Sequence, residues 1–362
     1  MSLATAGSRY IPDFRLQING AEIPAPLRAA ITSVRYETGL EGSDRVEVSI
    51  VDPGLRWMED ALLEPGGELA LAIGYHPNAI EEVFLGEISG LEYSFSTVQT
   101  LTVVAHDFLQ RLTRGTHDRS FPQLPDTIIA AIIAAESGLV PELDPAGLAQ
   151  TALFAALASK DDRPRMQIGQ SNYDFLRQLA AENGFEMSVE GRRFFFRTYL
   201  REQPSPEVAL RWGESLVEFA PRLTNVGQIL SVALKIWIEE LKLQLTAQVS
   251  WDGERVGIRV VPALFEEATK TFGVFVTMPE LPSDNPVEAI RAALSELRRR
   301  LNNRITGSGS TIGDPRIRAG RVIELEGLGA KFSGRNYRVT SAAHTIDSGG
   351  YRTSFQVRKE VF

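Results

Sequence analysis

The chain of 362 residues contains no cysteine and only four histidines, and both shortages restrict its chemistry. Without cysteine there is no disulfide and no thiolate metal ligand, which fits a protein that folds in a reducing cytoplasm. No two of the histidines (His76, His106, His117 and His344) fall at metal-ligand spacing, and no HExxH motif occurs. We therefore expect no metal site and no bound cofactor.

Motifs for catalysis are also missing. His106 and Asp107 are adjacent, but neighbouring residues of a strand point to opposite faces, so they do not form an acid–base pair. No GxSxG nucleophile motif is present. The segment from Gly307 to Gly313 follows a helical pattern and lacks the lysine of a phosphate loop, so we interpret it as a linker. We expect no catalytic residues.

The charge and the hydrophobic pattern exclude two further classes of protein. The formal net charge of −8 argues against a general nucleic-acid binder, because phosphate binding requires a basic surface. No apolar run approaches the roughly 18–20 residues that cross a bilayer. The first residues, MSLATAGSRYIPDF, lack the pattern of a secretion signal, so we expect a chain that is made in the cytosol and not secreted by the general route.

What the sequence does contain is mainly β patterning, beginning near the N-terminus. Apolar and polar residues alternate in 14–18, 46–50 and 69–73, and Asn19-Gly20 supplies a turn between two strands. About six short strands with glycine or proline between them are typical of a small antiparallel barrel or sandwich. We assign this first β-barrel to residues 1–111.

Helical patterns appear in residues 112–205, which we interpret as an α+β middle domain. One helix is predicted from Asp126 to the residues before Gly138, and a second from the capping sequence at Ser171 to Asn183-Gly184. Two strands, FEMSVE and RRFFFRTYL, follow with Gly191 at their turn.

Alternation returns after Pro206. We assign 206–240 and 313–362 to a second β-barrel, and 241–312 to an insertion with a helix at about 286–303. The layout of 27–52 is repeated in 213–239, and that of 67–107 in 319–358. Self-similarity in a fixed order indicates a duplicated unit, which points to symmetry in an assembly.

Three residues of the middle domain are candidates for a protein contact. Phe194-Phe195-Phe196 leaves one face of a strand with an aromatic side chain that something must cover, so Phe195 is a candidate for the interface. Arg192 and Arg193 are candidates for contact with an acidic neighbour, but ordinary surface charge is the favoured explanation for them.

The C-terminal segment and the middle domain together carry a resemblance to a known family. The C-terminal residues that match are Gly320, Gly327, Gly329, Gly334, Tyr337, His344, Gly350 and Tyr351. The runs VVAHDFLQRLTRG and SNYDFLRQLAAENGFEMSVEGRRFFFR match in the same order. In these features the chain resembles the phage late-control D proteins, the baseplate hubs of contractile tails and R-type pyocins, and the hub part of type VI VgrG proteins.

The resemblance implies a fold and a role. The expected fold is mainly β with α+β insertions, and it contains two tandem tube-protein-like antiparallel β-barrels. Three chains would form a pseudo-sixfold ring, a homotrimer that joins a sixfold inner tube or tube-initiator protein to a threefold spike. Because this sequence ends at Phe362, the spike is expected to be a separate protein, and baseplate wedge proteins are further expected partners.

Two other classes of function stay open from the residues alone. One is a β-rich hydrolase that acts on the cell wall, and the other is a monomeric ligand-binding β protein. The resemblance favours a structural protein of a phage tail-like particle or extracellular injection system, with no nucleic-acid recognition and no membrane segment.

Overall fold

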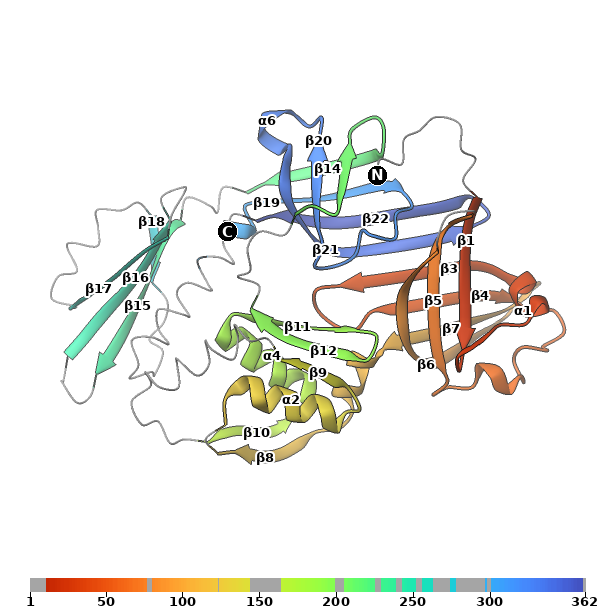
Figure 1. Cartoon of the computed structure of the whole chain (residues 1–362), viewed down its shortest axis with the longest axis horizontal. Helices are drawn as coiled ribbons and strands as arrows, with labels where there is room; N and C mark the ends of the chain where they lie inside the picture. Colours follow the sequence, from red (N-terminus) through yellow and green to blue (C-terminus); the bar gives the residue numbers. More distant parts are fainter. Residues whose placement is uncertain are drawn as a thin grey trace.

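The computed structural model describes residues 11–76, 80–122, 124–143, 164–198, 205–224, 229–238, 243–251, 256–262, 274–277, 297 and 301–360. The fold is mainly β, as expected. Its largest element is a sheet of 13 strands, to which residues near both ends of the chain contribute. In Figure 1 the N-terminal part of this sheet lies at the right, the C-terminal part at the top and the middle domain below.

The N-terminal part of the sheet is called the first β unit. It consists of β1 (Ile11–Ile18), β2 (Ala21–Glu22), β3 (Ile31–Gly39), β4 (Arg45–Val51), β5 (Glu68–His76), β6 (Glu81–Phe95) and β7 (Gln99–Asp107), with the short helices α1 (Ala25–Ala30), η1 (Ala61–Leu63) and η2 (Phe108–Thr113). The alternation seen in the sequence places one set of side chains in a buried core, which includes Leu16, Ile18, Val48 and Leu71. The strands predicted for this region are confirmed.

The C-terminal part of the sheet is called the second β unit. It consists of β13 (Val208–Arg211), β14 (Leu216–Leu223), β19 (Ile305–Ile312), β20 (Val322–Glu326), β21 (Gly334–Asp347) and β22 (Gly350–Lys359), with the short helix α6 (Gly329–Phe332). The strand order of the whole sheet is β14-β19-β22-β21-β3-β4-β7-β6-β5-β1-β2, with β20 and β13 branching from β21. Among the described residues this order has two ends, so the pairings do not close into two separate barrels.

The middle domain contains the two predicted helices. Its elements are β8 (His117–Phe121), α2 (Asp126–Glu136), β9 (Val140–Leu143), β10 (Arg165–Gln170), α4 (Asn172–Asn183), β11 (Phe185–Glu190) and β12 (Arg193–Thr198). Helix α4 begins as predicted, because the Ser171 hydroxyl accepts a hydrogen bond from the Asp174 N–H, and it ends at Gly184 in the left-handed conformation. The turn between β11 and β12 has Gly191 at positive φ.

Four strands form a separate sheet with the order β17-β16-β15-β18. They are β15 (Ile229–Ile238), β16 (Leu243–Trp251), β17 (Val256–Pro262) and β18 (Val274–Thr277). We expected 229–238 to belong to the second β unit, but β15 pairs with β16 and β18 instead. The predicted helix at 286–303 lies mostly outside the described residues.

One expectation for the insertion is corrected by the structure. Residues 307–310 were interpreted as a flexible linker, yet they lie in β19, which pairs with β14 on one side and β22 on the other. Glycine is required there because a Cβ on Gly309 would lie 2.8 Å from the ring of Phe355 and 3.1 Å from that of Phe219. The glycines make room for aromatic rings and do not mark a loop.

Candidate functional site

Five strands of each β unit have the same arrangement. The second β unit has the order β14-β19-β22-β21-β20, and the first has β3-β4-β7-β6-β5, with antiparallel pairing throughout both. The repeat predicted from 67–107 and 319–358 is therefore present in the strand order.

Irregularities of the backbone also coincide in the two units. The register shifts between Ile88 and Gly90 in β6, and between Val339 and Ser341 at the corresponding place in β21. The Gly66 N–H donates to the Ile88 carbonyl at 2.8 Å, and the Gly320 N–H donates to the Val339 carbonyl at 2.9 Å. Agreement at this level allows residues of β3, β4, β7 and β6 to be matched one by one with residues of β14, β19, β22 and β21.

The units meet where β21 pairs with β3, and we call this pairing the seam. It runs antiparallel from Ser341 opposite Gly39 to Ile346 opposite Val34. Only the C-terminal half of β21 takes part, since its N-terminal half pairs with β20. One continuous sheet thus crosses from one unit to the other.

His344 lies buried in the centre of the seam. Its Nε2 lies 3.0 Å from the Ile317 carbonyl, which can only accept, so Nε2 carries the proton. Nδ1 then presents its one lone pair to the hydroxyls of Tyr351, at 2.9 Å, and Thr353, at 3.0 Å, and accepts from one of them at a time. Burial lowers the pKa of His344 to about 4, so the ring is neutral near pH 7. This residue has a structural environment, with its hydrogen bonds satisfied inside the chain.

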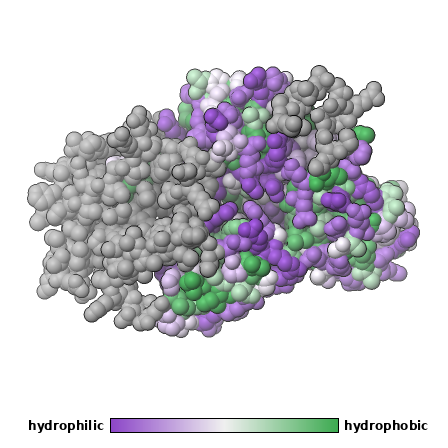
Figure 2. Space-filling view, viewed as in Figure 1, coloured by the Kyte–Doolittle hydropathy of each residue, from purple (hydrophilic) through white to green (hydrophobic). Residues whose placement is uncertain are grey.

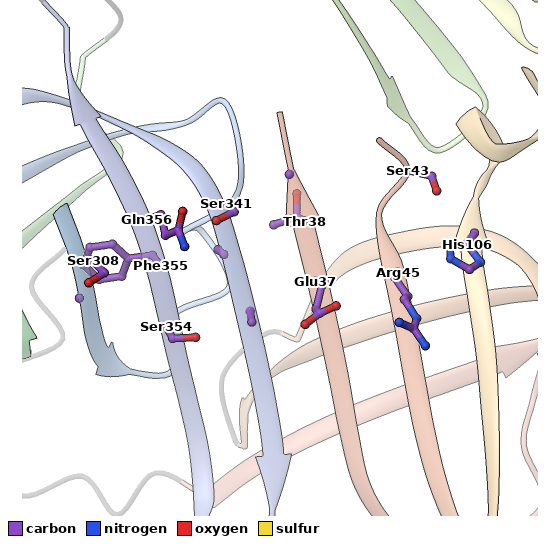
Figure 3. Close-up of a pocket in the computed structure, with 14 residues that line it drawn as sticks. Glu37, Thr38, Ser43, Arg45, His106, Ser308, Ser341, Ser354, Phe355 and Gln356 are labelled. Carbon is purple, nitrogen blue, oxygen red and sulfur yellow. The ribbon is translucent and has the colours of Figure 1, made fainter. Parts of the chain in front are cut away.

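A shallow polar groove of about 500 Å³ crosses the opposite face of the sheet at the seam. Figure 3 shows its side chains coming from adjacent strands of both units. Those on β19, β22 and β21 include Ser308, Ser354 and Ser341, and those on β3, β4 and β7 include Glu37, Arg45 and His106. The groove therefore lies across both units.

The charges in this groove neutralise one another. Arg35 pairs with Glu37 at 2.5 Å along β3, and Arg45 pairs with Glu47 at 2.6 Å along β4. The pKa of His106 is lowered by burial and by the nearby Arg45, so it adds no charge near neutral pH. The groove lining therefore carries charges of both signs together with several hydroxyl groups.

A second group of charges fixes the middle domain against the two β units. Arg338 on β21 is only 3% exposed and forms a two-point salt bridge with Glu186 on β11. Its guanidinium also lies 3.6 Å from the buried carboxylate of Glu360. Arg192 reaches Glu68 on β5, at 2.5 Å. The middle domain is thereby bound to both units.

The family-signature residues serve turns and the core of the second β unit. Four of the glycines, Gly320, Gly327, Gly329 and Gly350, have positive φ, where a side chain would be strained. Gly334 is different, because a Cβ there would lie 3.0 Å from the Lys359 amine. Tyr337 and Tyr351 are both buried. The Tyr337 hydroxyl donates to the Phe332 carbonyl at 2.7 Å, and Tyr351 packs beside His344.

The three candidate contact residues of the middle domain have partners within the chain. Phe195 is 9% exposed, and the guanidiniums of Arg193 and Arg197 lie over its ring at 5.2 and 4.4 Å. Arg193 also pairs with Glu142. Thus the aromatic side chain that the sequence left uncovered is covered by arginines of its own strand.

The residues that hold the seam were not predicted from the sequence. Tyr36, which lies opposite His344, was not singled out, and neither was Arg338. Nor did we single out Glu92, Tyr93 and Phe95 at the end of β6, although the alternation of Leu91, Tyr93 and Phe95 continues past the buried core. That continuation was the available signal.

An exposed apolar patch lies on the middle domain. Figure 2 shows hydrophobic residues gathered on the lower part of the molecule. The exposed side chains of this region include Leu124, Ile132, Met166 and Ile168.

Within the described ranges, no group of three or more His, Asp or Glu residues is arranged to hold a metal ion. None of the helices found there is long and apolar enough to span a membrane.

The fold is that of phage tail proteins, as comparison with solved structures shows. The 43 kDa tail protein of prophage MuSo2 from Shewanella oneidensis has a TM-score of 0.62 at 14% identity, over 96% of this chain and 98% of that one. A tail protein from Neisseria meningitidis MC58 has a TM-score of 0.63 at 12% identity, over 96% and 97%. The Escherichia coli c3393 protein, a component of the type VI secretion system, has 0.56 at 13%, over 94% and 76%.

The family can be stated as well. The model of the family described as "Alg8 N-terminal domain" matches residues 12–348, so the chain belongs to that family. The comparison with curated proteins found no match.

Proposed function

We propose that this protein is a structural baseplate hub of a contractile phage tail-like particle. It acts as a homotrimer that joins the sixfold inner tube, or its initiator protein, to a threefold spike formed by a separate protein. It is made in the bacterial cytoplasm, incorporated beside baseplate wedge proteins, and has no catalytic role.

The observation that carries the proposal is the continuous sheet in which one order of five strands occurs twice. Two equivalent units per chain give six tube-protein-like units in a trimer, while the chain itself repeats only three times. Such a ring presents six similar surfaces to one neighbour and three identical sets of insertions to another. The neutral polar groove, which crosses both units, suits the inner surface of a ring through which cargo passes.

The test is negative-stain imaging of the purified full chain, alone and mixed with the inner tube protein of the same particle. We expect rings with six peripheral masses and threefold symmetry. Monomers under every condition would contradict the proposal and favour a monomeric ligand-binding protein. Clearing of a peptidoglycan gel by the purified chain would favour a cell-wall hydrolase.

A further inference from the structure

The seam has an equivalent on each outer side of the chain. Within the seam, the C-terminal half of β21 meets the outer edge of β3. The equivalents of these strands are β6 and β14. In β6 only Glu81–Glu87 pairs with β5, which leaves that side of 89–95 without a strand among the described residues. Among the described residues β14 pairs with no strand other than β19, and one bridge joins Leu216 at its start to Trp212. Figure 1 shows β14 at the top of the view and β6 at the lower right.

We propose that the C-terminal half of β6 pairs, antiparallel, with β14 of a second copy of this chain, in the register of the internal seam. This inference rests on the proposed ring and names the strands that close it. The partner is a second copy because the chain already contains the same pairing between its own two units.

Coinciding register shifts fix which residues would meet. The shift at Ser89 in β6 corresponds to that at Thr340 in β21, so Tyr93 takes the place of His344. The shift after Leu216 in β14 corresponds to that after Ile31 in β3. Transferring the seam register then places Leu91 opposite Leu223, Glu92 opposite Arg222, Tyr93 opposite Pro221 and Phe95 opposite Phe219.

The residues brought together on the core face of the sheet are complementary. Tyr93 is 39% exposed, Phe95 is 66% exposed and Leu223 is 41% exposed, although all three extend apolar faces of their strands. The proposed pairing covers each of them with an apolar or aromatic partner. Cross-strand aromatic and apolar pairs are favourable contacts between strands.

On the groove side of the sheet the proposed pair is a carboxylate and a guanidinium. Glu92 takes the place of Ala343, and Arg222 takes the place of Glu37. The side chains of Glu92 and Arg222 would therefore be direct neighbours across the pairing. The Leu40 N–H donates to β21, and successive N–H groups of a strand alternate in direction, so the Glu37 N–H points away from the seam. The pair of Glu37 and Ala343, and by equivalence the pair of Arg222 and Glu92, therefore has no hydrogen bond between its backbones. Side chains approach closest at such pairs, which favours opposite charges.

Pro221 limits which strands can be added to this edge. Successive N–H groups of a strand alternate in direction, and the Thr224 N–H bonds to Arg304 on the β19 side. Pro221, which has no N–H, therefore lacks a donor only on the open edge, and the chain's own sheet loses no hydrogen bond. Phe219 and Leu223 keep their N–H donors on that edge. A strand edge that lacks this one donor disfavours the addition of arbitrary strands, but a strand in the proposed register can still pair with it.

The pairing is heterologous, because β6 of each copy meets β14 of the next. Such contacts form a closed ring or an open filament according to the rotation they impose. In a ring of three copies they provide three seams between chains, alternating with the three internal ones. All six units then have equivalent neighbours on both sides.

A disulfide test suits this chain because it has no cysteine of its own. The variant with Glu92→Cys and Arg222→Cys is purified in full length, shown to melt like the wild type, oxidised and run on a non-reducing denaturing gel. The positive control, Ala343→Cys with Glu37→Cys, links the same positions of the internal seam without change in mass. The negative control, Glu92→Cys with Glu218→Cys, moves one thiol four residues along β14.

We expect species of two and three times 39.9 kDa from the first variant, reverting to one chain on reduction. Each single-cysteine variant has one thiol per chain, so it can give a cross-linked dimer at most and no trimer. In a second measurement, Glu92→Arg or Arg222→Glu raises the concentration for half-assembly several-fold, and combining them restores it. If imaging still shows rings but the variant with Glu92→Cys and Arg222→Cys does not cross-link, the proposed pairing of β6 with β14 is wrong and the hub proposal stands. Monomers in both imaging and cross-linking would contradict both proposals.

Discussion

His344 lies directly opposite Tyr36 across the seam, and the two rings stack with their centroids 5.5 Å apart and 17° between their planes. Both side chains are almost completely buried. The Tyr36 hydroxyl donates to the Asp44 carboxylate at 2.7 Å, while His344 bonds to the second β unit. Separating the units would break this stack and expose polar groups of both, so the chain should behave as one rigid pair of units.

Replacing His344 by phenylalanine should destabilise the protein. The ring stack with Tyr36 can persist, but the Ile317 carbonyl loses its donor and the Tyr351 hydroxyl loses an acceptor in the buried core. Unsatisfied buried groups of this kind lower the free energy of unfolding by about 2–4 kcal/mol in total. Urea denaturation at pH 7 measures the loss.

The matched control is His106→Phe, on the polar face of the same sheet. His106 is only partly buried and bonds to Ser89, at 2.7 Å. Its replacement should change the free energy of unfolding by less than about 1 kcal/mol. Equal losses from the two substitutions would contradict a special role for the seam histidine.

The contribution of His344 should fall as the solution is acidified. Burial lowers its pKa from 6.5 to about 4 in the folded chain. Between these values the unfolded chain binds a proton and the folded chain does not, so stability is fully present above pH 6.5 and is lost towards pH 4. The stability difference between wild type and His344→Phe should shrink by about 3 kcal/mol over this range.

The difference between the two proteins is the useful quantity because other buried groups oppose the trend. Burial raises the pKa of Asp44 and of Asp107, and each therefore favours the folded chain as the pH falls. These groups are present in both proteins and largely cancel. A difference that stays constant from pH 7 to pH 4 would show that His344 is protonated equally in the folded and unfolded chains.

Local features of the fold were predictable because their signals are local. Helix α4 was placed correctly at both ends, since the Ser171 cap and the left-handed Gly184 act within one turn of the helix. Strand alternation similarly located β1, β4 and β5. Pairing between strands was less accessible: alternation in 229–238 indicates a strand but not its neighbours, and β15 belongs to a separate sheet.

One layer of the core explains why the repeat is faint in the sequence. In the first β unit three valines lie side by side on β3, β4 and β7, namely Val34, Val48 and Val103. The equivalent residues of the second unit are Phe219, Gly309 and Phe355. The second unit has two large rings on either side of a position without a side chain, whereas the first has three side chains of medium size. The layer is filled in both units, although no residue in it is identical. The glycine then resembles a linker residue when only the sequence is read.

This layer predicts that Gly309→Ala destabilises the chain. The added methyl group would lie 2.8 Å from the Phe355 ring and 2.8 Å from the Glu218 carbonyl. Overpacking of this kind lowers the free energy of unfolding by about 1–3 kcal/mol, although alanine normally suits a strand at least as well as glycine. Thermal unfolding followed by circular dichroism measures the effect. Gly54→Ala is the control, because its Cβ would meet nothing within 4 Å.

The attachment of the middle domain should depend on Arg338. Its guanidinium is 3% exposed and connects Glu186 of the middle domain with Glu360 of the C-terminal segment. Arg338→Met keeps most of the volume but leaves Glu186 without this partner and the buried Glu360 with Arg358 alone. Removing one partner of a buried charge pair lowers the free energy of unfolding by about 3 kcal/mol.

The loss should be localised, and a surface pair provides the comparison. Proteolysis should cut the Arg338→Met variant earlier between the middle domain and the β units than the wild type, before the β units are degraded. Arg321→Met removes a cation that is 37% exposed and pairs with Glu207 at 2.7 Å, so it should cost less than about 1 kcal/mol. If both variants resist proteolysis as the wild type does, the middle domain is held by its apolar contacts, and Arg338 contributes orientation without measurable attachment.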